Sequence, residues 1–281
     1  MIRKSYAKVN LFLHILKKRA DGYHNLFSLM HKINLFDYIE IKKNRGGIKL
    51  SSNVNDINDK NNLSYLSASE FFRISGIKPQ VDITIEKHIP IGAGLGGGSS
   101  NAAYTLLMLN EMFDHVLSKS SLKKISDSLG SDISFFLLNK PAIAQGRGDI
   151  LTSVNCDLNK YRLFLAVPSI KISTKYVYSR LLLTKRRPIN RMTSVADFKS
   201  CDFGYIKKFF YNDLENVVLK EFTIVSDVKL LLMTRFPYTL MSGSGSSVFS
   251  IVSKDEGVYQ KEIEDRLSTE RVFFRTLDFV D

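Results

Sequence analysis

The sequence has no long hydrophobic run. Even a strongly apolar stretch such as residues 161–168 is far shorter than the roughly eighteen residues that a membrane span needs. Residues 1–4 lead directly into an alternating pattern, without the apolar core and small-residue cleavage site of a signal peptide. We therefore expect no membrane partner and no secretion.

Cysteine is also scarce. The two cysteines, Cys156 and Cys201, have neither CxxC spacing nor a histidine cluster around them. A disulfide scaffold or a structural zinc site would therefore lack ligands. This pattern favours a reducing, cytoplasmic location.

Acidic residues are fewer than basic ones. The chain has 40 Lys and Arg against 28 Asp and Glu, a net charge of +12, and such a surface attracts polyanions, including phosphorylated ligands. The basic residues are scattered apart from 185–187 and 207–208, and no RNP-type aromatic motif lies beside them. We therefore expect small phosphorylated molecules, and not nucleic acid, as partners.

The chain does have the composition of a folded protein, with 44% hydrophobic and 24% charged residues. Its 281 residues are near the upper limit for one hydrophobic core, so two domains are expected. The N-terminal half predicts strands over 5–16 and 35–42 with a loop at 17–25 between them. The polar residues 44–62 predict an exposed connection before a helix over 63–74.

Periodicity is clearest in the middle of the chain. Residues 81–86 alternate apolar and polar side chains, which predicts a half-buried strand. Ala102, Leu106, Leu109 and Phe113 line one face of a helix, and a second helix is expected over 122–129.

The C-terminal part predicts the order strand, helices, strand, strand, helix, strand. These elements are expected over 161–167, 174–182, 226–234, around Tyr238 and Val248, and over 255–267 and 271–276. The order is that of a split β-α-β, ferredoxin-like layout. We place the domain boundary so that the domains are 1–157 and 158–281.

A glycine-dense segment is the strongest functional signal. Residues 85–103 read as a strand, a glycine-rich turn and a helix start in immediate succession. Glycine allows positive φ and a close approach of backbone to ligand, and the first amides of the helix then face an anion. Ser99 and Ser100 lie where a hydroxyl caps that helix or reaches a phosphate or its metal.

Other glycine loops fit this segment less well. A Walker A loop ends in Gly-Lys-Ser or Gly-Lys-Thr, whereas Ser99 and Ser100 follow the glycines here. A dinucleotide fingerprint needs an acid about twenty residues on, and Glu111 and Asp114 come too early. The His-Arg-Asp and Asp-Phe-Gly motifs of protein kinases do not occur, and a flexible linker does not normally join a clean strand to an amphipathic helix.

Residues 90–103 resemble the second motif of the GHMP kinase superfamily. Residues 7–11 (AKVNL) resemble its N-terminal motif, and residues 241–247 (MSGSGSS) its C-terminal glycine motif. With RADGYH at 19–24 and QGRG at 145–148, the chain is similar to one family within it, the kinases of 4-diphosphocytidyl-2-C-methyl-D-erythritol.

The resemblance implies an α+β, two-domain GHMP kinase fold. The N-terminal domain would be ATP-binding and like domain 2 of ribosomal protein S5, and the C-terminal domain would be ferredoxin-like. It also implies an ATP- and Mg²⁺-dependent kinase that phosphorylates the 2-hydroxyl of the cytidyl substrate in the non-mevalonate route to isoprenoid precursors. The small-molecule substrate and ATP would be its partners, and the chain would be a monomer or a homodimer.

The resemblance also implies the catalytic residues. Asp132 matches the general base, and Lys8 would hold Asp132 ionised and polarise the acceptor oxygen. Judged from the local sequence alone, Asp132 equally suits a helix cap, and a strand lysine such as Lys8 is usually exposed. Ser131 and Ser134 stand where this family commonly has alanine and proline; both replacements are small and leave Asp132 in place.

The remaining site residues also follow from the resemblance. Asn10, Tyr23 and His24 match substrate-binding positions, Tyr178 matches the aromatic on the other side of the cytosine, and Thr174 is a candidate hydroxyl contact. The expected ATP-binding residues are Asn62, Lys87, Pro90, Ile91, Gly92, Ala93, Gly94, Leu95, Gly96, Gly97, Gly98, Ser99 and Ser100. Magnesium keeps several waters; Ser100 is a candidate ligand for it, and no acid is assigned.

Two alternatives remain open. A GHMP kinase for another small alcohol, such as mevalonate or homoserine, would use the same glycine motifs, although Tyr23 and His24 would then have no base to bind. A nucleotide-binding protein without catalytic activity would not need both Lys8 and Asp132.

Overall fold

The chain folds into two compact units. The computed structural model describes residues 1–182, 194–255 and 261–280, so the basic run at 185–187 lies outside the described residues. The first unit comprises Met1–Ala7, Leu35–Ile89 and Gly96–Asn139, and the second comprises Lys8–Asn34, Pro90–Leu95 and Lys140–Asp281. The chain therefore passes between the units several times, and the domain boundary at 157 stays a prediction.

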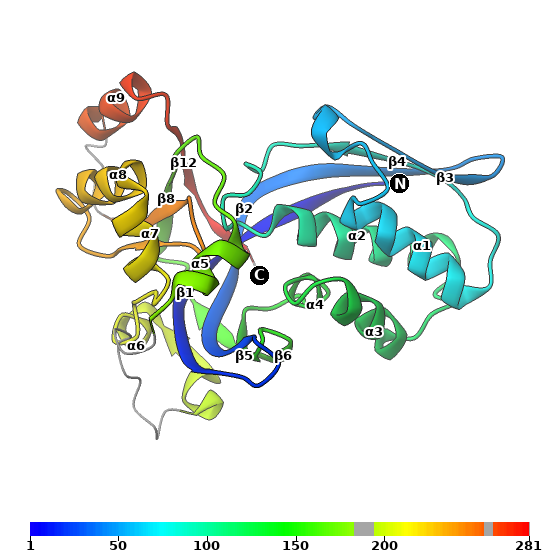
Figure 1. Cartoon of the computed structure of the whole chain (residues 1–281), viewed down its shortest axis with the longest axis horizontal. Coiled ribbons are helices and arrows are strands. Elements are labelled where there is room, and N and C mark those ends of the chain that lie inside the picture. Colours follow the sequence, from blue (N-terminus) through cyan, green and yellow to red (C-terminus); the bar gives the residue numbers. More distant parts are fainter. Residues whose placement is uncertain (183–193, 256–260, 281) are drawn as a thin grey trace. The chain divides into compact units, whose positions relative to one another are not determined.

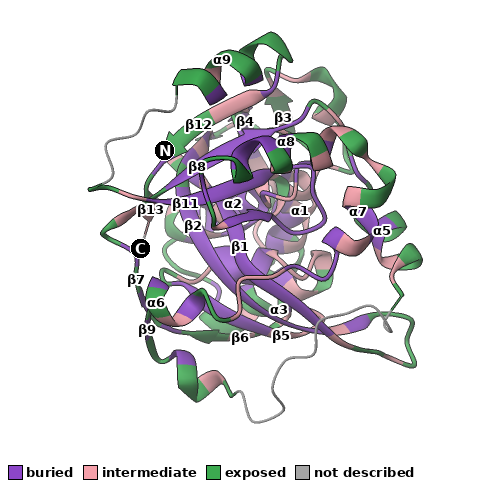
Figure 2. Ribbon diagram, turned by 90° about the vertical axis from the view of Figure 1, so that its left-hand side faces the viewer, coloured by how far each residue is buried: buried purple, intermediate pink, exposed green. Residues whose placement is uncertain are grey.

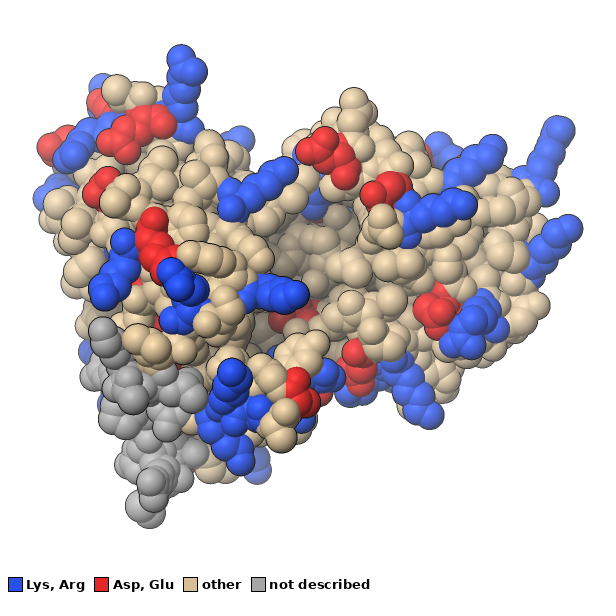
Figure 3. All heavy atoms as spheres, in the orientation of Figure 1, with Lys and Arg blue, Asp and Glu red and all other residues tan. Residues whose placement is uncertain are grey.

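Two long strands contribute to both units. They are β1 (Ile2–Lys18) and β2 (His24–Lys43), both longer than predicted, because the loop between them is confined to residues 19–23. Both are buried over most of their length (Figure 2). Lys and Arg side chains, more numerous than Asp and Glu, are scattered among uncharged residues on the face seen in Figure 3.

In the first unit, β4 (Gln80–Glu86) pairs antiparallel with β2, and β3 (Gly47–Ser52) pairs parallel with β4. Val81, Ile83 and Ile85 are buried, so the predicted alternating strand is confirmed. The connection predicted over 44–62 is exposed or half-buried in β3 and in the 3₁₀ helix η1 (Asn55–Ile57), as expected, but these two elements were not predicted within it. A polar segment forms a strand here because the backbone of β4 supplies its hydrogen-bonding partner.

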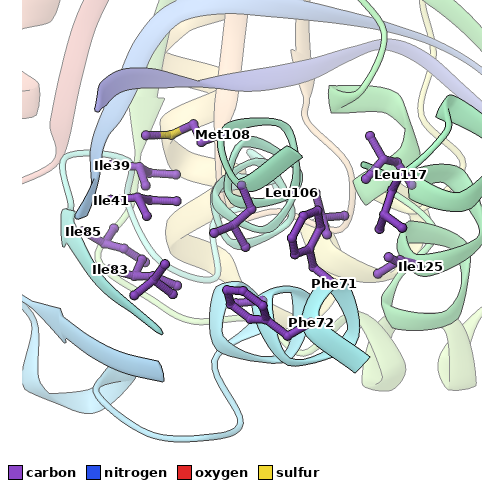
Figure 4. Packing of buried hydrophobic residues seen from close by; sticks show 14 residues of the cluster. Ile39, Ile41, Phe71, Phe72, Ile83, Ile85, Leu106, Met108, Leu117 and Ile125 are labelled. Atoms are coloured by element: carbon purple, nitrogen blue, oxygen red, sulfur yellow. The ribbon is translucent and has the colours of Figure 1, made fainter. Parts of the chain in front are cut away.

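Four helices complete the first unit: α1 (Leu63–Ser75), α2 (Gly97–Met112), α3 (Lys119–Leu129) and α4 (Ile133–Phe136). They lie beside one another in Figure 1. The core joins Ile39, Ile83 and Ile85 from the strands with Phe71 and Leu106 from the helices, as Figure 4 shows. The predicted helices at 63–74, 102–113 and 122–129 are confirmed.

In the second unit, four strands form an antiparallel sheet in the order β10-β11-β8-β12. These strands are β8 (Tyr161–Val167), β10 (Thr239–Met241), β11 (Val248–Ser253) and β12 (Phe273–Leu277). Numbered along the chain from β8, the order is 2-3-1-4, the arrangement of a ferredoxin-like fold, so the predicted C-terminal layout is confirmed.

Helices and short strands complete the second unit. The helices are α5 (Thr174–Arg180), α6 (Phe203–Ile206), α7 (Glu215–Glu221), α8 (Thr223–Met233), α9 (Lys261–Thr269) and the 3₁₀ helix η3 (Val195–Phe198). The strands are β5 (Ala142–Gly146), β6 (Ile150–Ser153), β7 (Asn155–Asp157), β9 (Ser200–Asp202) and β13 (Phe279–Val280). Strands β5 and β13 pair with β2, and β6 pairs with β5. None of these strands was predicted, because each has at most five residues and so carries little or no alternating pattern.

Candidate active site

The glycine loop has the backbone that its sequence predicts. Gly92, Gly94 and Gly96 have φ of 72°, 76° and 69°, in the left-handed region that favours glycine. Gly96 is the N-cap of α2, which begins at Gly97. The amides at 97–99 belong to the first turn, where helix geometry provides no intrahelical partner. Together with the helix dipole, they form the kind of anion site that a nucleotide phosphate needs.

In the second unit, the loop packs against the C-terminal glycine motif. The Ser242 hydroxyl donates to the Gly94 carbonyl over 3.1 Å, and the Ser247 amide donates to the Ala93 carbonyl over 3.1 Å. A Cβ added at Gly94 would meet the Ser242 carbonyl oxygen at 2.2 Å. Two motifs about 150 residues apart in sequence are thus brought together, and only a glycine at 94 allows the contact.

The C-terminal motif is held by residues that the sequence analysis missed. The buried Asn212 donates to the carbonyls of Met241 and Gly243, each over 2.8 Å. Glu215 accepts from the Met241 amide over 2.8 Å and from the Lys229 ammonium over 2.6 Å. Burial raises the pKa of the Glu215 carboxyl, against the opposing effect of Lys229. No sequence motif marks Asn212, Glu215 or Lys229, so only their contacts identify them.

Lys8 is buried and hydrogen-bonded, not exposed as strand lysines usually are. It is 4% exposed, and its ammonium donates to Asn10 Oδ1 over 2.6 Å. The Asn10 amide in turn donates to the Ser28 hydroxyl over 2.8 Å. The Lys8 backbone amide donates to the Leu95 carbonyl over 2.9 Å. Two predicted site residues, Lys8 and Asn10, are therefore in direct contact beside the glycine loop.

The predicted base-binding residues His24 and Tyr178 also lie together in the second unit. Their ring centroids are 5.3 Å apart with an interplanar angle of 36°. Burial, with a smaller contribution from Lys18, lowers the pKa of His24 below its usual value. A neutral imidazole has one donor and one acceptor nitrogen, which suits recognition of a base edge. Because the two rings touch, a base would stack on an outer face of the pair and not between them.

Tyr23 and Thr174 lie at the surface of the second unit. Tyr23 is 56% exposed, and the Arg147 guanidinium lies over its ring at 5.0 Å from the centroid. Thr174 is exposed at the start of α5, and its hydroxyl lies 2.8 Å from the Ser244 hydroxyl. Tyr23 therefore presents a face to solvent, and Thr174 connects α5 to the C-terminal glycine motif.

In the first unit, two of the predicted ATP-binding side chains have structural partners. Asn62 is the N-cap of α1: its side chain accepts from the Ser64 amide over 2.8 Å and donates to the Ile57 carbonyl over 2.9 Å. The Lys87 ammonium forms a buried ion pair with Asp37. Their local environments thus explain these residues without a ligand, and a role for either in binding ATP stays a prediction.

Asp132 stands at the N-cap position of α4, but its side chain makes no capping hydrogen bond. The local alternative, a helix cap, is therefore not what the carboxylate does. The nearby Ser134 hydroxyl donates to Asp127 and bonds the Ser126 hydroxyl. Because Asp127 and Ser126 belong to α3, Ser134 connects α4 to α3. Ser131, the other departure from the family pattern, lies half-buried beside Asp132.

The magnesium site is the least defined part of the prediction. In the described residues, no group of three or more His, Cys, Asp or Glu side chains is arranged to hold a metal. Ser100 is fully buried, and its hydroxyl lies 2.7 Å from that of Ser5. Magnesium bound through phosphate oxygens and water needs only one or two protein ligands, so the need for Mg²⁺ stays a prediction. In the same described ranges, no helix is both long and apolar enough to cross a membrane.

Known proteins match nearly the whole chain in sequence and in fold. The family model described as GHMP kinases N terminal domain matches residues 62–140. The 4-diphosphocytidyl-2-C-methyl-D-erythritol kinase of Clostridioides difficile (strain 630) is 39% identical over 261 residues, which are 90% of this chain and 87% of that protein. A crystal structure of 4-(cytidine 5'-diphospho)-2C-methyl-D-erythritol kinase superposes with a TM-score of 0.79 at 28% identity, covering 99% of each chain.

A homoserine kinase shares the fold at much lower identity. The crystal structure of the enzyme from Cytophaga hutchinsonii has a TM-score of 0.70 at 15% identity, covering 98% of this chain and 95% of that one. At this identity the likeness concerns the fold alone. The predicted α+β GHMP kinase fold is therefore confirmed.

Proposed function

The chain belongs to the family of 4-diphosphocytidyl-2-C-methyl-D-erythritol kinases, within the GHMP kinases, and we propose that it transfers the γ-phosphate of ATP to the 2-hydroxyl of that substrate. The observation that carries the proposal is 39% identity over 90% of the chain to a kinase of that name. The proposed reaction is a step in the supply of isoprenoid precursors, and it consumes one ATP for each alcohol phosphorylated.

The glycine loop supports ATP as the donor. Phosphoryl transfer depends on positioning and on stabilising the charge of the transferred group. The first-turn amides of α2, at 97–99, supply donors of fixed direction for this purpose. We assign the nucleotide phosphates to residues 90–100, with Mg²⁺ arriving on ATP. Since ATP is a cytoplasmic metabolite, we assign the reaction to the cytoplasm.

We assign proton removal to Asp132 and polarisation of the acceptor oxygen to Lys8. Asp132 is half-buried and is not used as a helix cap, so its carboxylate is compatible with the role of base that the family match implies. Lys8 is buried among polar side chains of β1 and β2, and its hydrogen bond to Asn10 holds the ammonium in place. General base catalysis contributes about 10²- to 10⁴-fold.

We assign the cytosine to His24 and Tyr178, with Tyr23 as a second stacking face. The two rings in contact offer an edge with hydrogen-bonding nitrogens and an aromatic face, which is the combination that recognises a base. Mevalonate and homoserine have no ring for these residues to bind. This difference in chemistry favours the cytidyl substrate over either small alcohol.

A substrate panel tests the proposed function directly. The purified chain is supplied with ATP, Mg²⁺ and one of three alcohols: 4-diphosphocytidyl-2-C-methyl-D-erythritol, mevalonate or homoserine. Formation of ADP is followed in a coupled assay. Turnover is expected with the cytidyl substrate only, and turnover with mevalonate or homoserine instead would refute the proposal. Nucleotide binding without turnover on any alcohol would indicate a non-catalytic protein.

Alanine variants test the catalytic assignment. Lys8→Ala and Asp132→Ala should each lower kcat by on the order of 10²-fold or more, with thermal melting showing that the variants are folded. Lys4→Ala is the matched control, because Lys4 lies on the same strand but is exposed, over the ring of Phe36. Near-normal kcat in both variants would remove Lys8 and Asp132 from the mechanism.

A further inference from the structure

Asp37 is a fully buried carboxylate to which the proposed reaction assigns no role. It lies in the part of β2 that belongs to the first unit and is 0% exposed. Its Oδ1 accepts from the backbone amides of His88 and Ile89, each over 2.8 Å. Its Oδ2 accepts from the Lys87 ammonium and, over 2.9 Å, from the Asn101 side chain. Three donors from residues 87–89 and one donor from α2 thus bind the same carboxylate.

These donors flank the glycine loop on both sides. Residues 87–89 directly precede Pro90, and Asn101 follows Ser100 in α2. Because two consecutive amides point at one carboxylate oxygen, the direction of the chain at the start of the loop is determined. Because Asn101 binds the other oxygen, the α2 end is held to the same point. A buried charge needs such partners, and removing one leaves the others uncompensated.

The same network determines where the Lys87 ammonium lies. Besides Asp37, it donates to Asn101 Oδ1 over 3.2 Å. A Cβ added at Gly97 would lie 3.1 Å from the Lys87 nitrogen and 3.0 Å from Ile89 Cγ2. The ammonium therefore lies against the first residue of α2, where the helix dipole already favours an anion. Asp37 and Asn101 together keep this positive charge at the start of the helix.

We infer that Asp37 is a positioning residue for the nucleotide: it sets both ends of the glycine loop and holds Lys87 at the start of α2. The inference rests on the proposed function only in assigning ATP to this loop. Lys87, one of the residues predicted to bind ATP, acts in this view through Asp37 and through the position of its charge. Asp37 is not expected to contribute to recognition of the acceptor alcohol.

The test is Asp37→Asn. The amide matches the carboxylate in shape, but its NH₂ group faces donors in either orientation, because both oxygens only accept hydrogen bonds here. The Kd of a non-hydrolysable ATP analogue and the KM for ATP should each rise about tenfold or more, while the KM for the cytidyl alcohol should change less than about threefold. Glu70→Gln is the control, since it removes an exposed ion pair with Arg73 on α1 of the same unit and should leave all three constants unchanged.

Unchanged affinity for the analogue in a folded Asp37→Asn protein overturns the inference. An equal rise in the KM for ATP and the KM for the cytidyl alcohol also overturns it, because the effect would not be specific to the nucleotide. If Asp37→Asn does not fold, Asn101→Ala decides, because it removes the Asn101 donor to Asp37 and the Asn101 acceptor of Lys87 but leaves the Asp37–Lys87 ion pair. A raised Kd for the analogue in Asn101→Ala supports the inference, and an unchanged Kd refutes it.

A double-mutant cycle tests the link between Asp37 and Lys87. Lys87→Met should raise the Kd of the analogue in the wild-type background and add little in the Asp37→Asn background. Additive effects would overturn the view that Lys87 acts through Asp37. Binding of the analogue requires no alcohol substrate. If the wild-type protein binds the analogue but does not phosphorylate the cytidyl alcohol, the proposed function fails while the inference about Asp37 is still decided.

Discussion

Replacing Gly98 with alanine separates a ligand-binding role of the glycine loop from a folding role. Gly98 is exposed in the first turn of α2, its φ is not in the left-handed region, and an added Cβ would meet only Leu63 Cδ1 at 3.9 Å. Alanine is favoured over glycine inside a helix by about 0.5–1 kcal/mol. The free energy of unfolding should therefore stay the same or rise by up to that amount, which is about 1–4 °C in Tm.

The affinity for ATP should fall in Gly98→Ala, although the stability of the protein stays the same or rises. If the amides at 97–99 contact the phosphates, a methyl group at residue 98 obstructs the approach of ATP. We expect the KM for ATP to rise at least about tenfold, equivalent to about 1.4 kcal/mol. Thermal melting and the coupled ADP assay on the same preparation measure both effects. A KM for ATP equal to that of the wild type would show that the backbone of residue 98 does not contact the nucleotide.

Two other glycines of the loop provide controls. Gly94→Ala combines a positive φ with overlap on backbone atoms, the Ser242 oxygen at 2.2 Å and the Gly245 oxygen at 3.0 Å, and should cost about 2–5 kcal/mol of stability. Gly92→Ala has a similar φ, but its nearest neighbour is a flexible side-chain atom of Lys171 at 3.4 Å, so only about 1–2 kcal/mol is expected. Equal Tm values for these two variants would refute the packing argument.

Three further predictions concern the second unit. Tyr178→Ala should raise the KM for the cytidyl substrate about tenfold, because a stacked base contributes about 1–3 kcal/mol; an unchanged KM would remove Tyr178 from the site. Burial and Lys18 lower the pKa of His24 below its usual 6.5, so the imidazole is neutral at pH 7. The KM for the cytidyl substrate should therefore rise only below pH 6.5, where His24 gains a proton. This rise should be absent in His24→Gln. Cys156 and Cys201 are both buried and lie directly opposite each other in the β7–β9 pair, so oxidation by diamide should close a disulfide with loss of two hydrogens. Mass spectrometry should find no such intramolecular bond in Cys156→Ser.

Local chemistry was enough to predict part of the fold and the site. The alternation of Val81, Ile83 and Ile85 predicted a half-buried strand because side chains alternate between the faces of any strand. The glycine loop was predictable because glycine alone adopts φ near 70° without strain. A polar segment such as β3 was not predictable, since its pairing depends on a strand about 30 residues later.

The sequence by itself determined the approximate positions of the longer helices, the turn at 92–96 and, through resemblance, the family. Only the tertiary structure decided that Lys8 is buried, that the two cysteines lie opposite each other, and that Asp37 binds donors 50 to 64 residues away. The physical reason is that φ preference and periodicity act on neighbouring residues. The partners of a buried charge are chosen by the packing of distant segments, which no local pattern contains.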